Sequence, residues 1–129
     1  MDVSLEYQKM CDCDEIQNDG HKTLMTGDFA ADRAQHYKVI VDNGKPYYKK
    51  YYIKLPRQDQ LQIMVMEYLW GETHPANRIS ALLQKFIWWL DATLPKFDSM
   101  EQLWLAFVMK ERHQKIWSGT EWVKGNNGN

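Results

Sequence analysis

The chain has 129 residues, of which 44% are apolar and 26% charged, and its formal net charge at pH 7 is −1. These values are ordinary for a globular protein that forms a hydrophobic core without disulfide or metal staples. No apolar run approaches the ~20 residues that a membrane span requires, and the acidic start, with Asp2 and Glu6, is not a signal peptide. We expect one domain in the cytoplasm.

Charge is distributed unevenly along the chain. Residues 1–35 carry eight acidic and three basic side chains, a net charge of −5, whereas residues 36–57 carry six basic and one acidic side chain, a net charge of +5. These are either two solvated faces that attract each other or one polarised binding surface. The six tryptophans and seven tyrosines likewise suit either a core or interface anchors.

The first half of the chain indicates one helix and one hairpin. Residues 3–17 carry an apolar stripe typical of a short helix. Residues 20–35 have weak periodicity, and we expect a loop with one helical turn near its end. Residues 36–42 and 47–55 alternate like strands, and Asn43-Gly44 between them is a strong signal for a type I′ hairpin turn.

The middle of the chain carries two amphipathic patterns. Residues 56–70 are apolar on two sides, which predicts a central helix that ends at Gly71. Residues 73–94 predict a helix with one clean apolar stripe, and Trp88 and Trp89 lie off that stripe. Its members are Ile79, Leu82, Leu83, Phe86, Ile87 and Leu90.

The stretch from residue 98 to residue 123 predicts one helix followed by a tight ribbon. Ser99 can cap the helix, with Gln102 three residues later, and apolar residues on two sides indicate that neighbours cover both. Residues 116–123 place two apolar runs around a Ser-Gly turn, so that their two tryptophans pair across the ribbon.

These elements predict an α+β fold in which three to four helices pack with a small antiparallel sheet built from β-hairpins. We expect residues 1–124 to form this domain and residues 125–129, which are polar and rich in glycine and asparagine, to form a disordered tail.

The sharpest chemical signal is Cys11 and Cys13 with His21 eight residues later, because thiolates and imidazole are zinc ligands. Candidates for a fourth ligand are Asp14, Asp19, His36 and His113. The spacing is not a standard one, and in a continuous helix the two cysteines would point about 200° apart. The alternative is a buried Cys11 that packs as a small hydrophobe. A disulfide across one residue would be strained.

A second signal is the interleaving of lysines and tyrosines over residues 45–54, here called the Lys/Tyr ribbon. It fits an acidic protein partner, or phosphate contacts with base stacking, or an edge strand that lysines protect from aggregation. The predicted partner-binding residues are Tyr48, Lys49, Lys50, Tyr52 and Lys54.

Catalytic motifs are missing from the sequence. It has no nucleophile elbow, no glycine-rich phosphate loop and no metalloprotease helix motif. His74 precedes a proline at a helix start and His113 lies near a helix C-terminus, and both positions favour structural roles. We expect no enzymatic activity and no catalytic residue.

Three segments resemble small accessory proteins that phages and prophages of Gram-positive bacteria encode. They are LPRQDQLQ at residues 55–62, SMEQLWLAFVMKE at 99–111 and KIWSGTEWV at 115–123. Looser matches are Tyr7-x-x-Met10-Cys11 and Glu15-Ile16-Gln17, so that the resemblance covers about half of the chain. Residues 18–35 and 71–95 do not take part in it, and Cys13 is not part of the pattern.

The resemblance implies an anti-CRISPR protein that binds a type II CRISPR effector nuclease of a streptococcal-type host stoichiometrically. Such an inhibitor can fill the basic nucleic-acid channel, which suits the acidic N-terminal third, or bind a recognition lobe, which suits the Lys/Tyr ribbon. Some anti-CRISPR proteins bind a structural zinc, which supports Cys11, Cys13 and His21 as ligands. The alternative is a phage accessory protein that binds nucleic acid through residues 45–54.

Overall fold

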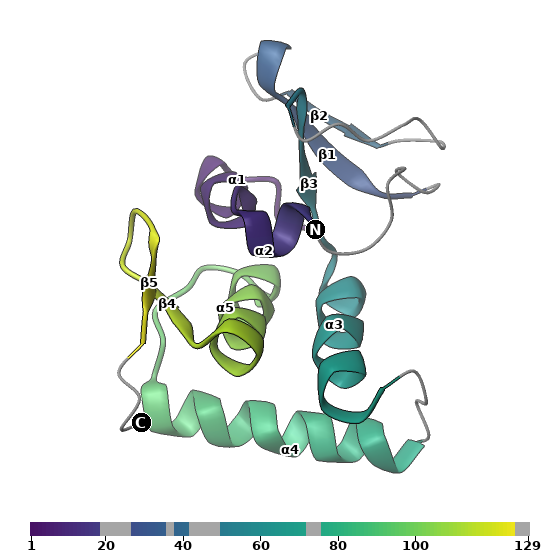
Figure 1. Ribbon diagram of the computed structural model, residues 1–129, viewed down its shortest axis with the longest axis vertical. Coiled ribbons are helices and arrows are strands. Elements are labelled where there is room, and N and C mark those ends of the chain that lie inside the picture. Colours follow the sequence, from purple (N-terminus) through teal and green to yellow (C-terminus); the bar gives the residue numbers. More distant parts are fainter. Residues whose placement is uncertain (19–26, 36–37, 42–49, 72–75, 126–129) are drawn as a thin grey trace.

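A computed structural model describes residues 1–18, 27–35, 38–41, 50–71 and 76–125, and the fold is α+β, as predicted (Figure 1). The elements in chain order are α1 Leu5–Cys11, α2 Asp14–Gln17, β1 Phe29–Asp32, the 3₁₀ helix η1 Arg33–Gln35, β2 Lys38–Val41, β3 Tyr52–Leu55, α3 Gln58–Trp70, α4 Ala76–Thr93, α5 Met100–His113, β4 Lys115–Trp117 and β5 Trp122–Lys124.

Helix α5 is the centre of the molecule. It contacts α1, α3 and β4, while α4 runs beneath it and α3 (Figure 1). Every residue from Trp104 to Met109 is buried, which requires neighbours on all sides and extends the predicted two-sided covering. Ser99 caps the helix, because its Oγ accepts the backbone N–H of Gln102 at 3.1 Å.

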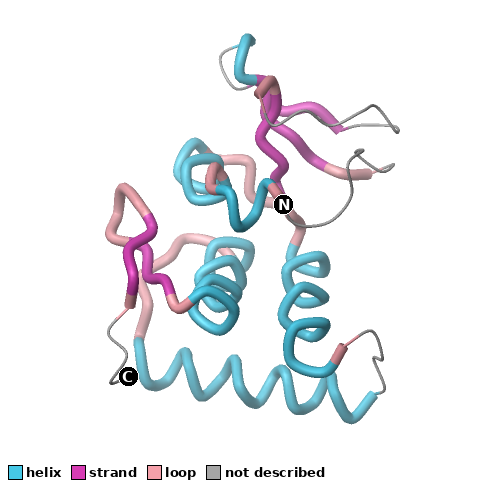
Figure 2. Tube along the Cα trace, viewed as in Figure 1, coloured by secondary structure: helices cyan, strands magenta, loops and turns pink. Residues whose placement is uncertain are grey.

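The three-stranded sheet has the antiparallel order β2-β1-β3 (Figure 2). The predicted hairpin is therefore wrong in its pairing: β2 and β3 both pair with β1 and lie on opposite edges of it. The Asn43-Gly44 turn lies outside the described residues. Strand β1 falls in the segment that we expected to be a loop, and its Ala30 and Ala31 are both 0% exposed. Close packing on both faces of the central strand selects these small residues.

The predicted helix over residues 3–17 is divided into α1 and α2. Asp12 leaves helical geometry at φ −80° and ψ 68°, and Cys13 is extended at φ −144° and ψ 154°. The Asp12 carboxylate accepts two hydrogen bonds from Arg33, at 2.9 and 2.7 Å. This paired contact to η1 accompanies the break, and it gives the structure two short helices in place of one.

The C-terminal ribbon forms as predicted. Trp117 pairs with Trp122 across β4 and β5, and their ring centroids lie 5.0 Å apart. Both indole N–H groups fasten the ribbon to α1: Trp117 donates to the Glu6 carboxylate at 3.0 Å and Trp122 to the Met10 carbonyl at 2.7 Å. Gly125, which we assigned to the tail, donates to the Gln114 carbonyl at 2.7 Å and closes the ribbon.

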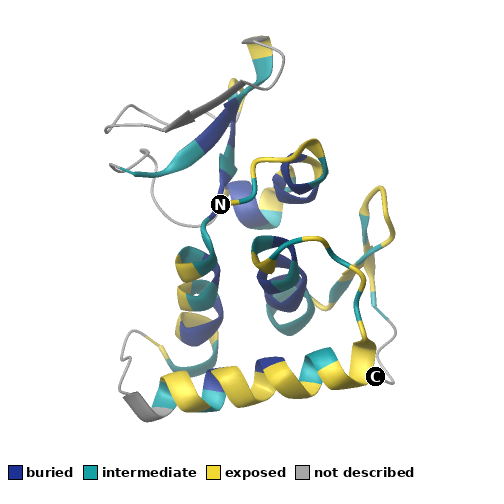
Figure 3. Cartoon of the chain, turned by 180° about the vertical axis from the view of Figure 1, so that it is seen from behind, coloured by how far each residue is buried: buried dark blue, intermediate teal, exposed yellow. Residues whose placement is uncertain are grey.

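Two predicted helix faces differ from the structure. Helix α3 is apolar on two sides in sequence, but Ile63 and Tyr68 are exposed and α5, not α3, is the enclosed helix. In α4 only part of the predicted stripe is covered, and much of its outer side is solvent-exposed (Figure 3). Among the described helices, none combines the length and the hydropathy that crossing a bilayer requires.

Candidate partner-binding surfaces

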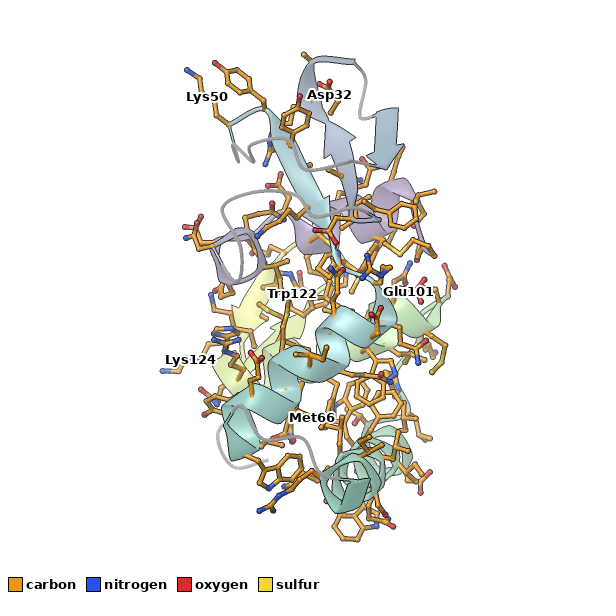
Figure 4. The ribbon with its side chains drawn as sticks, turned by 90° about the vertical axis from the view of Figure 1, so that its right-hand side faces the viewer. Asp32, Lys50, Met66, Glu101, Trp122 and Lys124 are labelled. Carbon is orange, nitrogen blue, oxygen red and sulfur yellow. The ribbon has the colours of Figure 1, made fainter. Side chains whose placement is uncertain are left out.

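The described part of the Lys/Tyr ribbon, residues 50–54, lies at the far end of the molecule from α4, where Lys50 projects beyond β3 (Figure 4). Three of its five predicted partner-binding residues are described: Lys50 is exposed, whereas Tyr52 and Lys54 are half-buried. Tyr48 and Lys49 lie outside the described residues. On β3, Ile53 and Leu55 fill the core, so that the predicted alternation holds for the strand.

The backbone of β3 does not offer a free edge at Lys54. On the side away from β1, the Gln17 side chain donates to the Lys54 carbonyl at 3.1 Å and accepts the Lys54 N–H at 2.8 Å. A partner strand therefore cannot add at this position without displacing Gln17. Recognition through this end of the sheet must use side chains.

Lys50 and Tyr51, which directly precede β3 and are here called the tip, combine a cation with an aromatic ring. The Lys50 ammonium lies 5.7 Å from the centroid of the Tyr51 ring, which is a cation–π contact. Tyr51 is 51% exposed, and its carbonyl accepts the Arg33 N–H at 2.9 Å, which fixes the backbone beneath it. The sequence predicted Lys50 as a contact residue, whereas Tyr51 was not among the predicted partner-binding residues.

Most acidic residues of the N-terminal third serve the fold itself. The carboxylates with partners inside the chain, each followed by its partner, are Asp2 with Ser99, Glu6 with Trp117, Asp12 with Arg33, Glu15 with Lys115, Asp28 with Arg57 and Asp32 with the Ala34 N–H. None of the cations in these pairs belongs to the Lys/Tyr ribbon. Most carboxylates of the acidic segment therefore stabilise the fold through contacts within the chain. Fewer of them are left to mimic the phosphates of nucleic acid in a basic channel.

Two of these carboxylates have lowered pKa values. Burial alone would raise the pKa of Asp2, but hydrogen bonds from Ser99, Ser4 and Gln102 outweigh it and lower the pKa. Burial acts in the same direction on Glu15, and the Lys115 ammonium outweighs it, so that the pKa of Glu15 is also lowered. Both groups are therefore held as carboxylates by their partners.

The break between α1 and α2 removes the geometric objection to zinc, because Cys11 and Cys13 no longer share one helix. Cys11 is wholly buried, and burial raises the pKa of its thiol well above the ordinary value. Cys13 is partly buried, with its pKa raised to about 12 mainly by burial, and its Sγ donates to the Met10 carbonyl at 3.7 Å. His21 lies outside the described residues.

The described part of the chain contains no cluster of three metal-ligating side chains, and it leaves the zinc prediction open in both directions. The two thiols fit zinc as ligands, since Cys11 and Cys13 are only two positions apart at the break between α1 and α2. The burial of Cys11 fits the alternative equally, as a small apolar side chain beside Tyr7 and Met10 in the core.

Helix α4 carries an exposed apolar surface that the sequence did not predict. Ile79, Leu83 and Ile87, which belong to the predicted apolar stripe, are 49%, 43% and 48% exposed. Leu82 and Phe86 are the buried members, and they lie along one flank of these three residues. Periodicity located the apolar side of α4 but could not reveal how much of it the rest of the chain covers.

Comparisons with known proteins add no relative to this description. No protein-family model, no curated protein and no solved structure matches the chain.

Proposed function

We propose that this protein is a non-enzymatic, phage-encoded anti-CRISPR inhibitor that acts in the host cytoplasm. It binds a type II CRISPR effector nuclease stoichiometrically through the Lys/Tyr ribbon and blocks the loading or cleavage of target DNA. The resemblance of residues 55–62, 99–111 and 115–123 to phage accessory proteins carries this proposal.

The positions of these segments support a shared scaffold. Residues 99–111 form most of the central helix α5, residues 115–123 form the ribbon that contacts it, and residues 55–62 begin α3, which also packs on α5. Segments that are distant in sequence thus form one contiguous body. The stretch 71–95, which does not take part in the resemblance, contains α4, whose outer side is exposed.

The choice of the Lys/Tyr ribbon as the contact follows from charge. The acids of the N-terminal third are occupied by Arg33, Arg57, Lys115 and uncharged donors. The exposed Lys50 at the tip is therefore available to an acidic surface of the effector, with Tyr51 as an aromatic contact beside it. Because Gln17 occupies the β3 edge, this contact relies on side chains.

A second candidate function rests on the same tip. A lysine above a half-exposed tyrosine also suits single-stranded nucleic acid, with the ring stacking on a base and the ammonium contacting a phosphate. Salt dependence distinguishes the two functions. Nucleic-acid binding through several lysines weakens steeply between about 50 and 200 mM salt, whereas a packed protein interface does not.

The test is calorimetric titration of a purified type II effector–guide complex with the protein. The Lys49→Glu, Lys50→Glu double variant removes binding if the ribbon is the contact. The matched control is Lys85→Glu, Lys96→Glu, which makes the same charge change at exposed lysines outside the ribbon and retains binding. Equal binding by both variants would remove the ribbon from the interface. If neither variant binds the effector, the loss of binding is an effect of net charge alone.

A further inference from the structure

The exposed residues Ile79, Leu83 and Ile87 of α4 follow one another at intervals of four, and we call them the α4 row. Residues four apart lie side by side on a helix surface and form a continuous ridge. Each side chain in this ridge is between 43% and 49% exposed. The α4 row is therefore an apolar ridge of three residues that the described chain leaves about half exposed.

The charges at the ends of α4 have the wrong sign for an isolated helix. Its first turn contains no acid, although a helix N-terminus favours negative charge, and Arg78 in that turn lies over the Trp70 ring of α3 at 5.5 Å from its centroid. Its last turn contains Asp91 and no base, although the C-terminus favours positive charge. Asp91 lies four residues after Ile87 and therefore continues the α4 row at its C-terminal end.

We propose that the α4 row binds a second copy of this chain, with the two α4 helices antiparallel about a two-fold axis at Leu83. The row is self-complementary, because reversing it about Leu83 exchanges one isoleucine for the other. Ile79 then packs against Ile87 of the second copy, and Leu83 packs against its own counterpart. Two ridges of this kind pack side by side in the commonest class of helix–helix contact.

Charge complementarity selects the antiparallel arrangement. When the helices run in opposite directions, each Asp91 lies beside the first turn of the other α4, where the helix N-terminus provides positive potential. A parallel pair would place each Asp91 beside another Asp91, which is repulsive. Asp91 thus gains a favourable neighbour only in the antiparallel dimer.

The dimer is independent of the proposed inhibitor function. The sheet end with Lys50 lies opposite α4, so that dimerisation through α4 leaves Lys50 of both copies accessible (Figures 1 and 4). Trp88 is 63% exposed and lies on the outer side of α4. It follows Leu83 by five residues, which places it about 140° around the helix axis from Leu83. It therefore provides a matched control position outside the α4 row.

The first test measures the molar mass of the purified chain by light scattering or sedimentation over about 1 to 300 μM, the range expected for a modest apolar contact. The mass rises from one to two chains with concentration. Leu83→Glu raises the dimer dissociation constant by about tenfold or more, because it places two like charges on the axis. Trp88→Glu has little effect. Asp91→Asn weakens the dimer, and more strongly at low salt.

The second test determines direction with single cysteines under mild oxidation, and the unmodified chain controls for Cys11 and Cys13. Leu83→Cys forms an intermolecular disulfide with itself. Ile79→Cys and Ile87→Cys crosslink only when the two variants are mixed. Each position lies about 6 Å along the helix from the axis, so that like positions of the two copies are about 12 Å apart. Trp88→Cys remains uncrosslinked.

Three results would overturn the proposal. The first is a monomeric mass over the whole concentration range. The second is self-crosslinking of Ile79→Cys, which would demand parallel helices. The third is that the natural chain is monomeric and Leu83→Glu abolishes its binding to an effector. The α4 row would then bind the effector and not a second copy of the chain. Circular dichroism of each variant confirms that its helices are intact, and the conservative cysteine variants keep the test valid if Leu83→Glu unfolds.

Discussion

Phe86 of α4 stacks on Trp104 of α5, with ring centroids 3.8 Å apart and ring planes within 5° of parallel. Phe107 meets both rings nearly at right angles, at 5.3 and 5.7 Å. This aromatic cluster attaches α4 to the central helix through one side only. Ile87 of the α4 row follows Phe86 directly and lies further around the helix. The α4 row therefore remains outside the core.

Adjacent residues of α4 should consequently differ greatly in their contribution to stability. Phe86→Ala removes a side chain that is 5% exposed, and we expect it to lower the free energy of unfolding by about 3 to 5 kcal/mol. Ile87→Ala, at 48% exposure, should cost less than about 1 kcal/mol in the monomer. Urea unfolding at low protein concentration compares the two. Similar losses would mean that the cluster does not hold α4 in place.

The second prediction concerns Gln17, whose side-chain amide is 4% exposed. It pairs with both backbone groups of Lys54 and also donates to the Cys11 carbonyl at 2.8 Å. Gln17→Ala leaves these groups without their partner, and we expect a loss of about 2 to 4 kcal/mol in the free energy of unfolding. Gln84→Ala on the exposed side of α4 is the control and should be nearly neutral. A loss at Gln17 no larger than that control would contradict the role of the amide.

The third prediction is a dependence on pH through Asp2, which accepts hydrogen bonds from Ser99 Oγ at 2.5 Å and Gln102 Nε2 at 2.8 Å. Its pKa in the folded chain is lower than the ordinary value of 3.8. The unfolded chain therefore takes up the proton first as pH falls. The stabilisation is complete above the unfolded pKa and is lost as pH falls through the folded one.

Asp2→Asn tests this dependence. We expect the variant to be about 1 kcal/mol less stable than the natural chain at pH 7, and the difference should shrink as pH falls through the lowered pKa of Asp2 in the folded chain. Urea unfolding at a series of pH values measures it. Glu67→Gln, at an exposed position of α3 outside the α4 row, is the control and should not produce the same convergence. A constant difference at all pH values would show that the Asp2 carboxylate is not the responsible group.

The fourth prediction is zinc binding by Cys11, Cys13 and His21. Because burial holds both thiols protonated at neutral pH, zinc uptake must release protons and should weaken as pH falls. Mass spectrometry of metal content after purification with zinc should give one ion per chain, and Cys13→Ser and His21→Ala should lose it. Zinc well below stoichiometry in the natural chain would leave Cys11 as a core side chain.

Local signals predicted the elements whose structure is set locally. The helix over residues 100–113 has a capping serine and a continuous apolar pattern, and the ribbon over residues 115–124 has a tight turn with tryptophans on both sides. Both appear in the structure as expected. In these segments the capping, periodicity and turn signals agree with the tertiary packing.

Strand pairing was not predictable in the same way. The Asn43-Gly44 signal predicted a hairpin, but β2 and β3 are separated by β1, whose sequence Phe-Ala-Ala-Asp has little intrinsic strand preference. Ala30 and Ala31 are in a strand because they fill a tightly packed sheet centre, and this information lies in the neighbours rather than in the segment. The candidate sites were named from residue chemistry alone, and three of their eight residues, His21, Tyr48 and Lys49, lie outside the described chain.

The most direct measurement of the central claim is target-DNA cleavage by a purified type II effector–guide complex, with this protein added before the DNA. The account predicts inhibition that saturates near one protein per effector and that Lys49→Glu, Lys50→Glu abolishes. Full cleavage with excess protein across several type II effectors would contradict the inhibitor function, and would favour nucleic-acid binding through the Lys/Tyr ribbon in its place.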